Sequence, residues 1–476
     1  MPRLRKLAWD ADPMQVALAW PIDRPLQMLH SGRVHPRWAR FSILASPRVV
    51  FRSDGLSTLN GADDLLLNVD LTHDPLVDLD RLLEATRLDP NAGMQHSIPF
   101  SGGWIGYLSY DLGRYIEPVA QHSAGPEDDR HWPFLELAWC PDALIYDHVE
   151  HTWFEIGTIP ELEALMSRVR TGTHDETTHL DIGDLKSSID RQGHMKLIER
   201  TVDHIARGDL FQANITQRFS ASFQGEPREL WRNAMIASRA WYGGYLEFDD
   251  PQGKTARRIV SLSPELFLHV DQASRLTTTR PIKGTRSLEQ GAKELLESVK
   301  DQAELNMIID LMRNDLGRVC EYGTVKVTTP RMIETHPTIH HGVGEIQGVL
   351  REDVSIGDLL KATFPAGSVT GAPKIRAMQL IDELESVRRG PYCGSVGFFC
   401  DSGNVELSVS IRTIGLTGTR DPITNAFSGV LDYGAGGGIV AESQAGAEYR
   451  ESLDKIEVLL ETIRGIRNSL ESPLAS

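Results

Sequence analysis

Helix-like and strand-like segments follow one another irregularly along this chain of 476 residues, and that order constrains its fold most strongly. Apolar residues recur with helical spacing over residues 191–206, 291–316, 375–384 and 445–466, and the segments between them are β-like. A doubly wound sheet would require a regular alternation of strands and helices. The sequence therefore predicts an α+β fold.

Two main regions joined by a polar linker are predicted. Residues 1–170 contain short apolar segments separated by tight turns, a pattern that is typical of strands. Residues 171–186 include a run of threonine, histidine and acidic residues and form the predicted linker. The second region spans residues 187–466, and residues 467–476 form a C-terminal tail.

Composition limits the classes of binding partner and the cellular compartment that we expect for this chain. The formal net charge of -17 opposes binding to nucleic acid or to an anionic membrane, so an anionic substrate would need local cations or a metal ion. The N-terminus lacks the apolar stretch of a signal peptide, and no window is long and apolar enough to span a bilayer. We therefore expect a cytoplasmic protein. The cysteines show no metal-like spacing and are expected to be packed free thiols, at Cys140, Cys320, Cys393 and Cys400.

Lys283, in the segment of residues 281–285, is the candidate nucleophile. Two β-like segments, residues 257–270 and 275–279, predict a hairpin that carries Lys283 back to the level of Glu265. A lysine becomes nucleophilic when burial or a neighbouring cation lowers its pKa, and a nearby glutamate can move protons to a leaving group. The alternative is a surface lysine after a proline turn, since most lysines are exposed.

Three glutamates on predicted helices are candidate metal ligands. Glu304 lies on an apolar helix face, where a carboxylate is costly unless a cation meets it. Glu448 and Glu451 project from one face of the last helix together with Lys455. A small number of hard oxygen donors suits Mg²⁺, which often bridges to an anionic substrate. The alternatives are a glutamate at the edge of its apolar stripe and an ordinary acidic first turn.

Two glycine-rich segments and one arginine are candidate sites for an anionic group. Residues 367–374 combine glycines with Thr370 and with a proline that suits a first helical turn, whose free amides attract an anion. Their spacing is not that of a Walker loop. Residues 434–438 can present backbone amides to a carboxylate. Arg412 lies in an alternating stretch and could hold a carboxylate through two nitrogens, although a surface arginine is equally compatible with that pattern.

Six segments in this chain resemble, in order, the motifs of the chorismate-utilising enzymes. They are residues 263–265, 281–285, 310–316, 367–374, 411–413 and 436–440. The resemblance covers nearly the whole chain, including the N-terminal segments at residues 28–33, 101–103 and 110–114. It implies an α+β fold of two large, mostly antiparallel sheets with helices packed outside, to which both halves of the chain contribute.

The same resemblance implies a reaction and roles for single residues. Lysine in the 281–285 motif is the mark of the branch that aminates chorismate at C4, where it attacks ring C2 as the C4 hydroxyl departs and is expelled when ammonia adds. Lys283 would be the nucleophile and Glu265 the general acid and base. Glu304 and Glu451 would bind Mg²⁺, with Glu448 beside them. The substrate-binding residues would be Thr370, Tyr392, Arg412, Gly438, Lys455 and His341.

The same resemblance implies which partner supplies ammonia and which other branches of the family are alternatives to C4 amination. No Gly-x-Cys-x-Gly motif surrounds any cysteine, so a separate glutamine amidotransferase subunit is implied as the partner that supplies ammonia. The product would lead, through a lyase, to 4-aminobenzoate and folate. The alternatives are the anthranilate synthase branch, which carries alanine in place of the lysine, the isochorismate and salicylate synthases, and a silent chorismate-binding regulatory relative.

Two departures from the family pattern lie beside predicted site residues. At residues 304–307 the usual order of asparagine and leucine is reversed, which puts Asn306 where an apolar residue is expected. After His341 the family's bulkier residues are replaced by Gly342 and Gly344, which removes bulk and a hydroxyl. The sequence therefore leaves the placement of His341 open.

Overall fold

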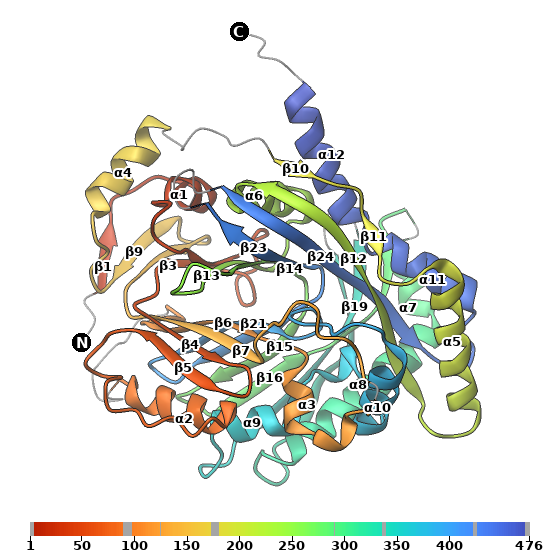
Figure 1. The fold of residues 1–476 in the computed structure, drawn as a ribbon. Coiled ribbons are helices and arrows are strands. Elements are labelled where there is room, and N and C mark those ends of the chain that lie inside the picture. The colour runs from red at the N-terminus through yellow and green to blue at the C-terminus, as the bar shows by residue number, and fades with distance from the viewer. Residues whose placement is uncertain are drawn as a thin grey trace.

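Two large antiparallel sheets with helices on their outer sides make up the protein (Figure 1). The structure is a computed structural model and describes residues 4–88, 98–123, 125–172, 180–289, 291–335, 339–421 and 426–471. This arrangement confirms the predicted α+β fold of antiparallel sheets with helices outside.

The first sheet contains 13 strands within the described residues, in the order β1-β9-β8-β3-β2-β13-β14-β23-β24-β12-β10, and β11 and β20 also pair with β12. Their bounds are β1 (Leu4–Leu7), β2 (Gln27–His30), β3 (Phe41–Ala45), β8 (Ala143–Asp147), β9 (Thr152–Ile156), β10 (Asp181–Ile182), β11 (Lys186–Ser187), β12 (Gln212–Gly225), β13 (Tyr242–Asp249), β14 (Ala256–Ser263), β20 (Gly371–Ala372), β23 (Thr413–Arg420) and β24 (Phe427–Ile439).

The second sheet contains 11 strands in the same part of the chain, in the order β17-β19-β16-β15-β22-β21-β6-β7-β4-β5, with β18 pairing with β19. Their bounds are β4 (Val49–Ser53), β5 (Ser57–Gly61), β6 (Gly103–Leu108), β7 (Leu135–Cys140), β15 (Leu266–Asp271), β16 (Leu276–Arg280), β17 (Ile282–Ser287), β18 (Lys326–Thr335), β19 (Ile339–Val349), β21 (Ser395–Cys400) and β22 (Val405–Val409). Both halves of the chain therefore contribute strands to both sheets, as expected.

Helices cover the outer face of each sheet (Figure 1). Those over the first sheet are α1 (Pro13–Ala19), α4 (Leu162–Thr171), α6 (Pro227–Ser238) and α12 (Glu457–Glu471). Those over the second are α2 (Pro75–Ala85), α3 (Leu112–Ile116), α8 (Val299–Gly317) and α9 (Ile356–Thr363), whereas α10 (Lys374–Leu384) contacts β12 and β20 of the first sheet. The remaining elements are α5 (Arg191–Ala206), α7 (Ala292–Glu297), α11 (Ala445–Asp454), η1 (Pro118–Ala120) and η2 (Gly367–Val369).

Apolar side chains fill three layers of this arrangement. One buried cluster lies between the sheets and includes Ile105, Phe248, Ile259 and Phe398. The other two join each sheet to its outer helices. Since burial of apolar surface is the main favourable contribution to folding, neither half of the chain can complete a core alone.

Two of the four predicted helices are interrupted. Residues 191–206 and 375–384 are helical as predicted, in α5 and α10. The predicted helix at 291–316 is divided into α7 and α8 because the side chain of Ser298 accepts a hydrogen bond from the N–H of Asp301 and starts a new helix. The predicted helix at 445–466 is divided at Lys455, whose side chain donates to the carbonyl of Gly436.

The predicted linker and tail are described only in part. Residues 173–179 of the linker and 472–476 of the tail lie outside the described residues, and the described linker contributes β10 and β11 to the first sheet. The four cysteines are free and buried, as expected. None of the helices in the described ranges is both long and apolar enough to cross a membrane.

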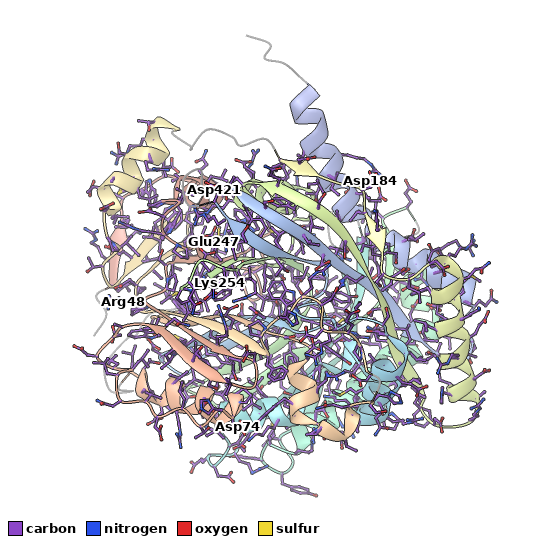
Figure 2. All side chains as sticks on the ribbon, viewed as in Figure 1. Arg48, Asp74, Asp184, Glu247, Lys254 and Asp421 are labelled. Carbon is purple, nitrogen blue, oxygen red and sulfur yellow. The ribbon has the colours of Figure 1, made fainter. Side chains whose placement is uncertain are left out.

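A buried ion pair connects the outer helix α6 to strand β13. Arg228 donates to both carboxylate oxygens of Glu247, at 2.9 and 3.0 Å, and to the carbonyl of Trp20. Figure 2 shows Glu247 among the side chains inside the molecule, whereas Arg48 and Asp74 lie near its edge. Burial opposes the charge on Glu247, but Arg228 and Arg258 outweigh it and hold the pKa of the carboxyl at about 2.

We expect Arg228→Ala to lower the free energy of unfolding by about 3–5 kcal/mol, because it leaves the Glu247 carboxylate buried without its main partner. Chemical denaturation measures this change. Arg464→Ala is the control, since Arg464 pairs with Glu457 at 2.7 Å on the exposed surface of α12 and such pairs contribute at most about 1 kcal/mol. Equal effects of the two substitutions would contradict the account.

Candidate functional site

The chain passes from one sheet to the other at two adjacent points, and the candidate site lies there. β14 belongs to the first sheet and β15, which follows Pro264, to the second, so Glu265 lies at the crossing. β22 and β23 make the reverse crossing, with Arg412 between them. The Leu262 N–H donates to the Arg412 carbonyl at 3.1 Å, and the Val409 N–H donates to the Glu265 carbonyl at 3.0 Å. These backbone bonds hold the two crossings together.

The predicted hairpin brings Lys283 to Glu265. β15 and β16 pair in antiparallel register, with Asp271 opposite Leu276 at the turn, and β17 follows directly. Both side chains then contact Ser368. The Ser368 hydroxyl donates to Glu265 Oε1 at 2.6 Å, and Lys283 Nζ donates to the Ser368 carbonyl at 3.4 Å. The structure therefore brings the predicted acid and the predicted amine together through one residue.

The environment moves the pKa values of both groups toward neutrality. Burial raises the pKa of Glu265 to about 7, against the opposing effects of the Ser368 hydroxyl and the Lys283 ammonium. Burial also lowers the pKa of Lys283, and the Lys455 ammonium acts in the same direction while the Glu304 carboxylate opposes it. These opposite shifts bring the pKa values of the carboxyl and the amine closer together, which favours proton transfer by both groups.

The three predicted metal ligands face the same region from α8 and α11. A Cβ on Gly437 would lie 3.3 Å from Glu451 Oε1, 3.5 Å from Lys455 Nζ and 3.6 Å from Glu448 Oε2. Burial raises the pKa of Glu304, which is also influenced by Lys283 and by the Glu451 charge. Glu304, Glu451 and Lys283 are therefore close enough to interact electrostatically.

Two of these carboxylates lie close to ammonium groups, and the third accepts from a serine hydroxyl. Glu451 Oε1 accepts from Lys455 at 2.8 Å, and Glu304 Oε1 lies 3.8 Å from Lys300 Nζ. Burial raises the pKa of Glu448, although the Ser443 hydroxyl donates to it at 2.7 Å. No three acidic, histidine or cysteine side chains of the described residues form a ready metal site. Three carboxylates have the donor chemistry that Mg²⁺ prefers, and side-chain rotation away from the lysines would free them.

Four predicted substrate-binding residues surround the catalytic pair. A Cβ on Gly438 would lie 3.2 Å from Lys283 Nζ, so the end of β24 approaches the amine closely. Lys455 donates to the Gly436 carbonyl at 2.7 Å. Thr370 is fully buried, and its hydroxyl donates to the Ala366 carbonyl at 3.1 Å. The fourth, His341, is buried on β19.

Arg412 lies at the crossing between β22 and β23, and Tyr392 lies just before β21. Arg412 has a φ of 53°, a left-handed conformation that is uncommon for a residue with a long side chain. Burial lowers the pKa of its guanidinium, and the neighbouring Tyr433 opposes this shift. The Tyr392 ring packs on Gly434, where a Cβ would lie 2.1 Å from a ring carbon. A glycine at this position of β24 is therefore needed for the ring to pack there.

Gln212 and Ser368 are two polar residues at the site that the sequence analysis did not single out. Gln212 is fully buried, and neither polar atom of its side chain has a hydrogen-bond partner. Its Nε2 would lie 2.7 Å from a Cβ on Gly438, which places it beside the Lys283 amine. An unpaired buried amide is costly, so we interpret Gln212 as a residue that completes its hydrogen bonds with a bound molecule.

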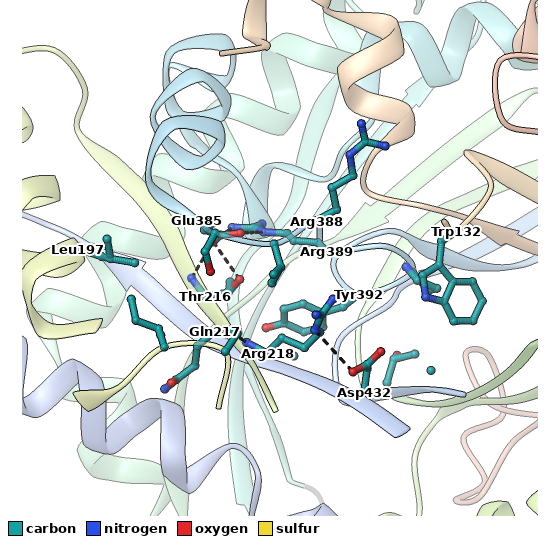
Figure 3. A pocket seen from close by; sticks show the side chains of 18 residues that line it. Trp132, Leu197, Thr216, Gln217, Arg218, Glu385, Arg388, Arg389, Tyr392 and Asp432 are labelled. Carbon is teal, nitrogen blue, oxygen red and sulfur yellow. Dashed lines mark hydrogen bonds and ion pairs between the residues drawn. The ribbon is translucent and has the colours of Figure 1, made fainter. Parts of the chain in front are cut away.

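One cleft adjoins the site but does not contain the catalytic pair. It encloses about 640 Å³ including its open mouth, and Trp132, Tyr392, Arg218 and Glu385 are among its lining residues (Figure 3). Tyr392 is the predicted site residue that lines it. Charged side chains in its wall are paired, as the dashed contacts of Arg218 with Asp432 and of Glu385 with Thr216 show (Figure 3). We give more weight to the cluster around Lys283, where the titrating groups converge.

The structure accommodates both departures from the family pattern. Leu305 is buried and Asn306 is exposed, so the reversed order keeps an apolar residue in the core. A Cβ on Gly342 would lie 2.6 Å from the Lys283 carbonyl, so the small residue leaves room for β17. His341 Nδ1 lies 2.9 Å from the Thr285 hydroxyl. Both departures are thus compatible with the site geometry.

Comparison with known proteins identifies the relatives of this chain. Residues 37–461 match the family described as chorismate binding enzyme. The chain is 34% identical over 474 residues to aminodeoxychorismate synthase component 1 of Escherichia coli (strain K12), which covers 97% of this chain and 98% of that protein. It is 32% identical over 473 residues to anthranilate synthase component 1 of Pseudomonas aeruginosa, covering 93% and 91%. Anthranilate synthase component I from Streptococcus pneumoniae TIGR4 superposes with a TM-score of 0.71 at 30% identity, covering 90% and 93%.

We expect Gly434→Ala to lower the free energy of unfolding by about 1–3 kcal/mol, because the added methyl group would displace the Tyr392 ring. Gly446→Ala is the matched control, since a Cβ at that position of α11 would meet nothing within 4 Å. It should be neutral or stabilising, because alanine favours helix over glycine. Denaturant titration compares the two, and an unchanged stability of Gly434→Ala would contradict the proposed seating of Tyr392.

Proposed function

The chain belongs to the family of chorismate binding enzymes, and we propose that it is the subunit that aminates chorismate at C4 to give 4-amino-4-deoxychorismate. The observation that carries this proposal is the Lys283 amine, which lies beside an acid with a pKa of about 7 and contacts the same residue. The relatives named aminodeoxychorismate synthase component 1 support it.

The proposed chemistry consists of two displacements. The Lys283 amine forms a bond to ring C2 while the C4–oxygen bond breaks and Glu265 gives its proton to the departing oxygen, which leaves as water. Ammonia then forms a bond to C4, the bond to Lys283 breaks, and Glu265 takes a proton from the new ammonium centre. Two allylic steps replace one difficult substitution, as covalent catalysis generally does.

Residues around the Lys283 amine would bind the anionic substrate. Arg412 would hold a carboxylate with two guanidinium nitrogens, and the backbone at Gly438 with the Tyr392 hydroxyl would complete that contact. Thr370, His341 and Lys455 would line the rest of the substrate site. These placements follow the family resemblance and the positions of the residues around Lys283.

Glu304, Glu451 and Glu448 would hold Mg²⁺, which would neutralise a substrate carboxylate when bound. The metal would replace Lys300 and Lys455 as the counter-charge of Glu304 and Glu451. An acidic protein could thereby receive a dianion, because a bound cation reverses the local field. Ammonia would come from a separate glutamine amidotransferase subunit.

Identification of the product tests the function. Chorismate, Mg²⁺ and ammonium are incubated with the protein, with and without an aminodeoxychorismate lyase. We expect 4-aminobenzoate with the lyase. Anthranilate formed without it, or isochorismate or salicylate formed without ammonium, would contradict the proposal and identify another branch of the family.

We expect Lys283→Ala to lower the rate of C4 amination by about 10³-fold or more, since the nucleophile is lost and little packing changes. Lys254→Ala, in the exposed turn between β13 and β14, is the control and should keep full activity. Circular dichroism establishes that both variants are folded. A folded Lys283→Ala protein with near-normal amination would exclude the covalent role.

The rate of amination should fall as the pH rises through about 7. Glu265 must be protonated to protonate the departing hydroxyl, and burial raises its pKa to about 7 from the usual 4.5. The same shift stabilises the folded protein below about pH 4.5, and this contribution is lost as the pH rises toward 7 because only the unfolded state ionises freely. A pH profile of kcat/KM, which reports the groups of the free protein, measures the first effect, and a flat profile between pH 6 and 8 would contradict it.

A further inference from the structure

We propose that Ser368 positions the acid and the amine relative to one another, and that its hydroxyl directs the reactive proton of Glu265 to Oε2. This role deepens the proposed function and rests on it. The residue is 6% exposed, and its two polar groups point to different partners: the hydroxyl donates to Glu265 Oε1 at 2.6 Å and the carbonyl accepts from Lys283 Nζ at 3.4 Å.

The segment that carries Ser368 is held by contacts on three sides. Arg389 donates to the Val369 carbonyl at 3.0 Å, and the guanidinium is itself held by the buried carboxylate of Glu385 at 2.7 Å. The Thr370 hydroxyl closes the turn by donating to the Ala366 carbonyl. On the third side, a Cβ on Gly367 would lie 2.9 Å from a methyl carbon of Leu311 on α8. The position of Ser368 is therefore fixed independently of Glu265 and Lys283.

A hydrogen bond to one carboxyl oxygen decides where the proton lies. The unprotonated oxygen of a carboxyl group is the better acceptor, so donation from Ser368 to Oε1 favours the proton on Oε2. The Oε2 proton is then the one given to the departing C4 oxygen as the C–O bond breaks. The resulting negative charge is stabilised by the same Ser368 donor, because hydrogen bonds to an ionised acceptor are the stronger ones.

The other groups around Glu265 complement this role without replacing it. The Lys283 ammonium and the backbone N–H of Ile282 also favour the ionised carboxyl, whereas burial opposes it. Lys283 releases its ammonium proton to solvent before it attacks ring C2 and is positively charged again once it is bonded to carbon, so its charge beside Glu265 changes during the reaction. Ser368 is thus the side-chain donor that remains on Glu265 throughout both displacements.

Ser368→Ala and Ser368→Thr test the role. In Ser368→Ala we expect kcat to fall by about 10- to 100-fold with the KM for chorismate nearly unchanged, since a hydrogen bond to a charged group is lost in the transition state. The alkaline limb of the pH profile should move to higher pH, because the donor that favoured the carboxylate is gone. Ser368→Thr, which keeps the hydroxyl, should restore both the rate and the limb.

A second measurement does not depend on turnover. The infrared carbonyl band of protonated Glu265, assigned by its absence in Glu265→Gln, should shift to higher frequency in unliganded Ser368→Ala and remain in place in Ser368→Thr. An unchanged band and pH limb in folded Ser368→Ala, or no rescue by threonine, would overturn the role of Ser368. A band shift in Ser368→Ala, together with a wild-type protein that does not aminate chorismate, would overturn the proposed function and leave the contact intact.

Discussion

The double crossing of strands between the two sheets is the constraint on which the rest of the site depends. One antiparallel ribbon, formed by β14 with β23, continues as β15 with β22 in the other sheet, and the backbone bonds at Leu262 and Val409 fix the point of transfer. A residue at such a point belongs to neither sheet face, so Glu265 and Arg412 can direct their side chains into the space between elements. The hairpin of β15 and β16 then adds Lys283, and the ends of β12 and β24 add Gln212 and Gly438.

Burial and the neighbouring charges shift the pKa values of the groups at the site. The chain has a formal net charge of -17, yet two lysines, Lys283 and Lys455, lie among three glutamates at the site. Burial moves the pKa of Glu265 upward and that of Lys283 downward, so both groups titrate closer to neutrality than they would in water. Ser368 connects them, and its segment is anchored by the Arg389 and Glu385 pair rather than by the catalytic groups.

The sequence predicted the elements that depend on local pattern. The fold class, the hairpin before Lys283 and the helices at residues 191–206 and 375–384 follow from periodicity and turn residues, and the structure contains them. The break at Ser298 was missed because capping by one side chain competes with an otherwise continuous helical pattern, and no residue of the pattern marks the break at Lys455.

Other features of the site depend on partners that are distant in sequence. The segments on either side of Pro264 look like one interrupted strand, and only their pairing with β23 and β22, more than 130 residues later, assigns them to different sheets. Gln212 and Ser368 lie in segments where a polar residue is unremarkable. Their importance appears only when Gln212 is found buried without a partner and Ser368 is found between Glu265 and Lys283.

The central claim is that the amine of Lys283 attacks the substrate directly. Mass spectrometry of the protein after rapid acid quenching, with chorismate and Mg²⁺ but without ammonia, tests it most directly. The account predicts a covalent adduct with the mass of chorismate less water on the peptide that contains Lys283, which disappears when ammonium is added. Steady C4 amination upon addition of ammonium, without any adduct on that peptide before it, would contradict the claim.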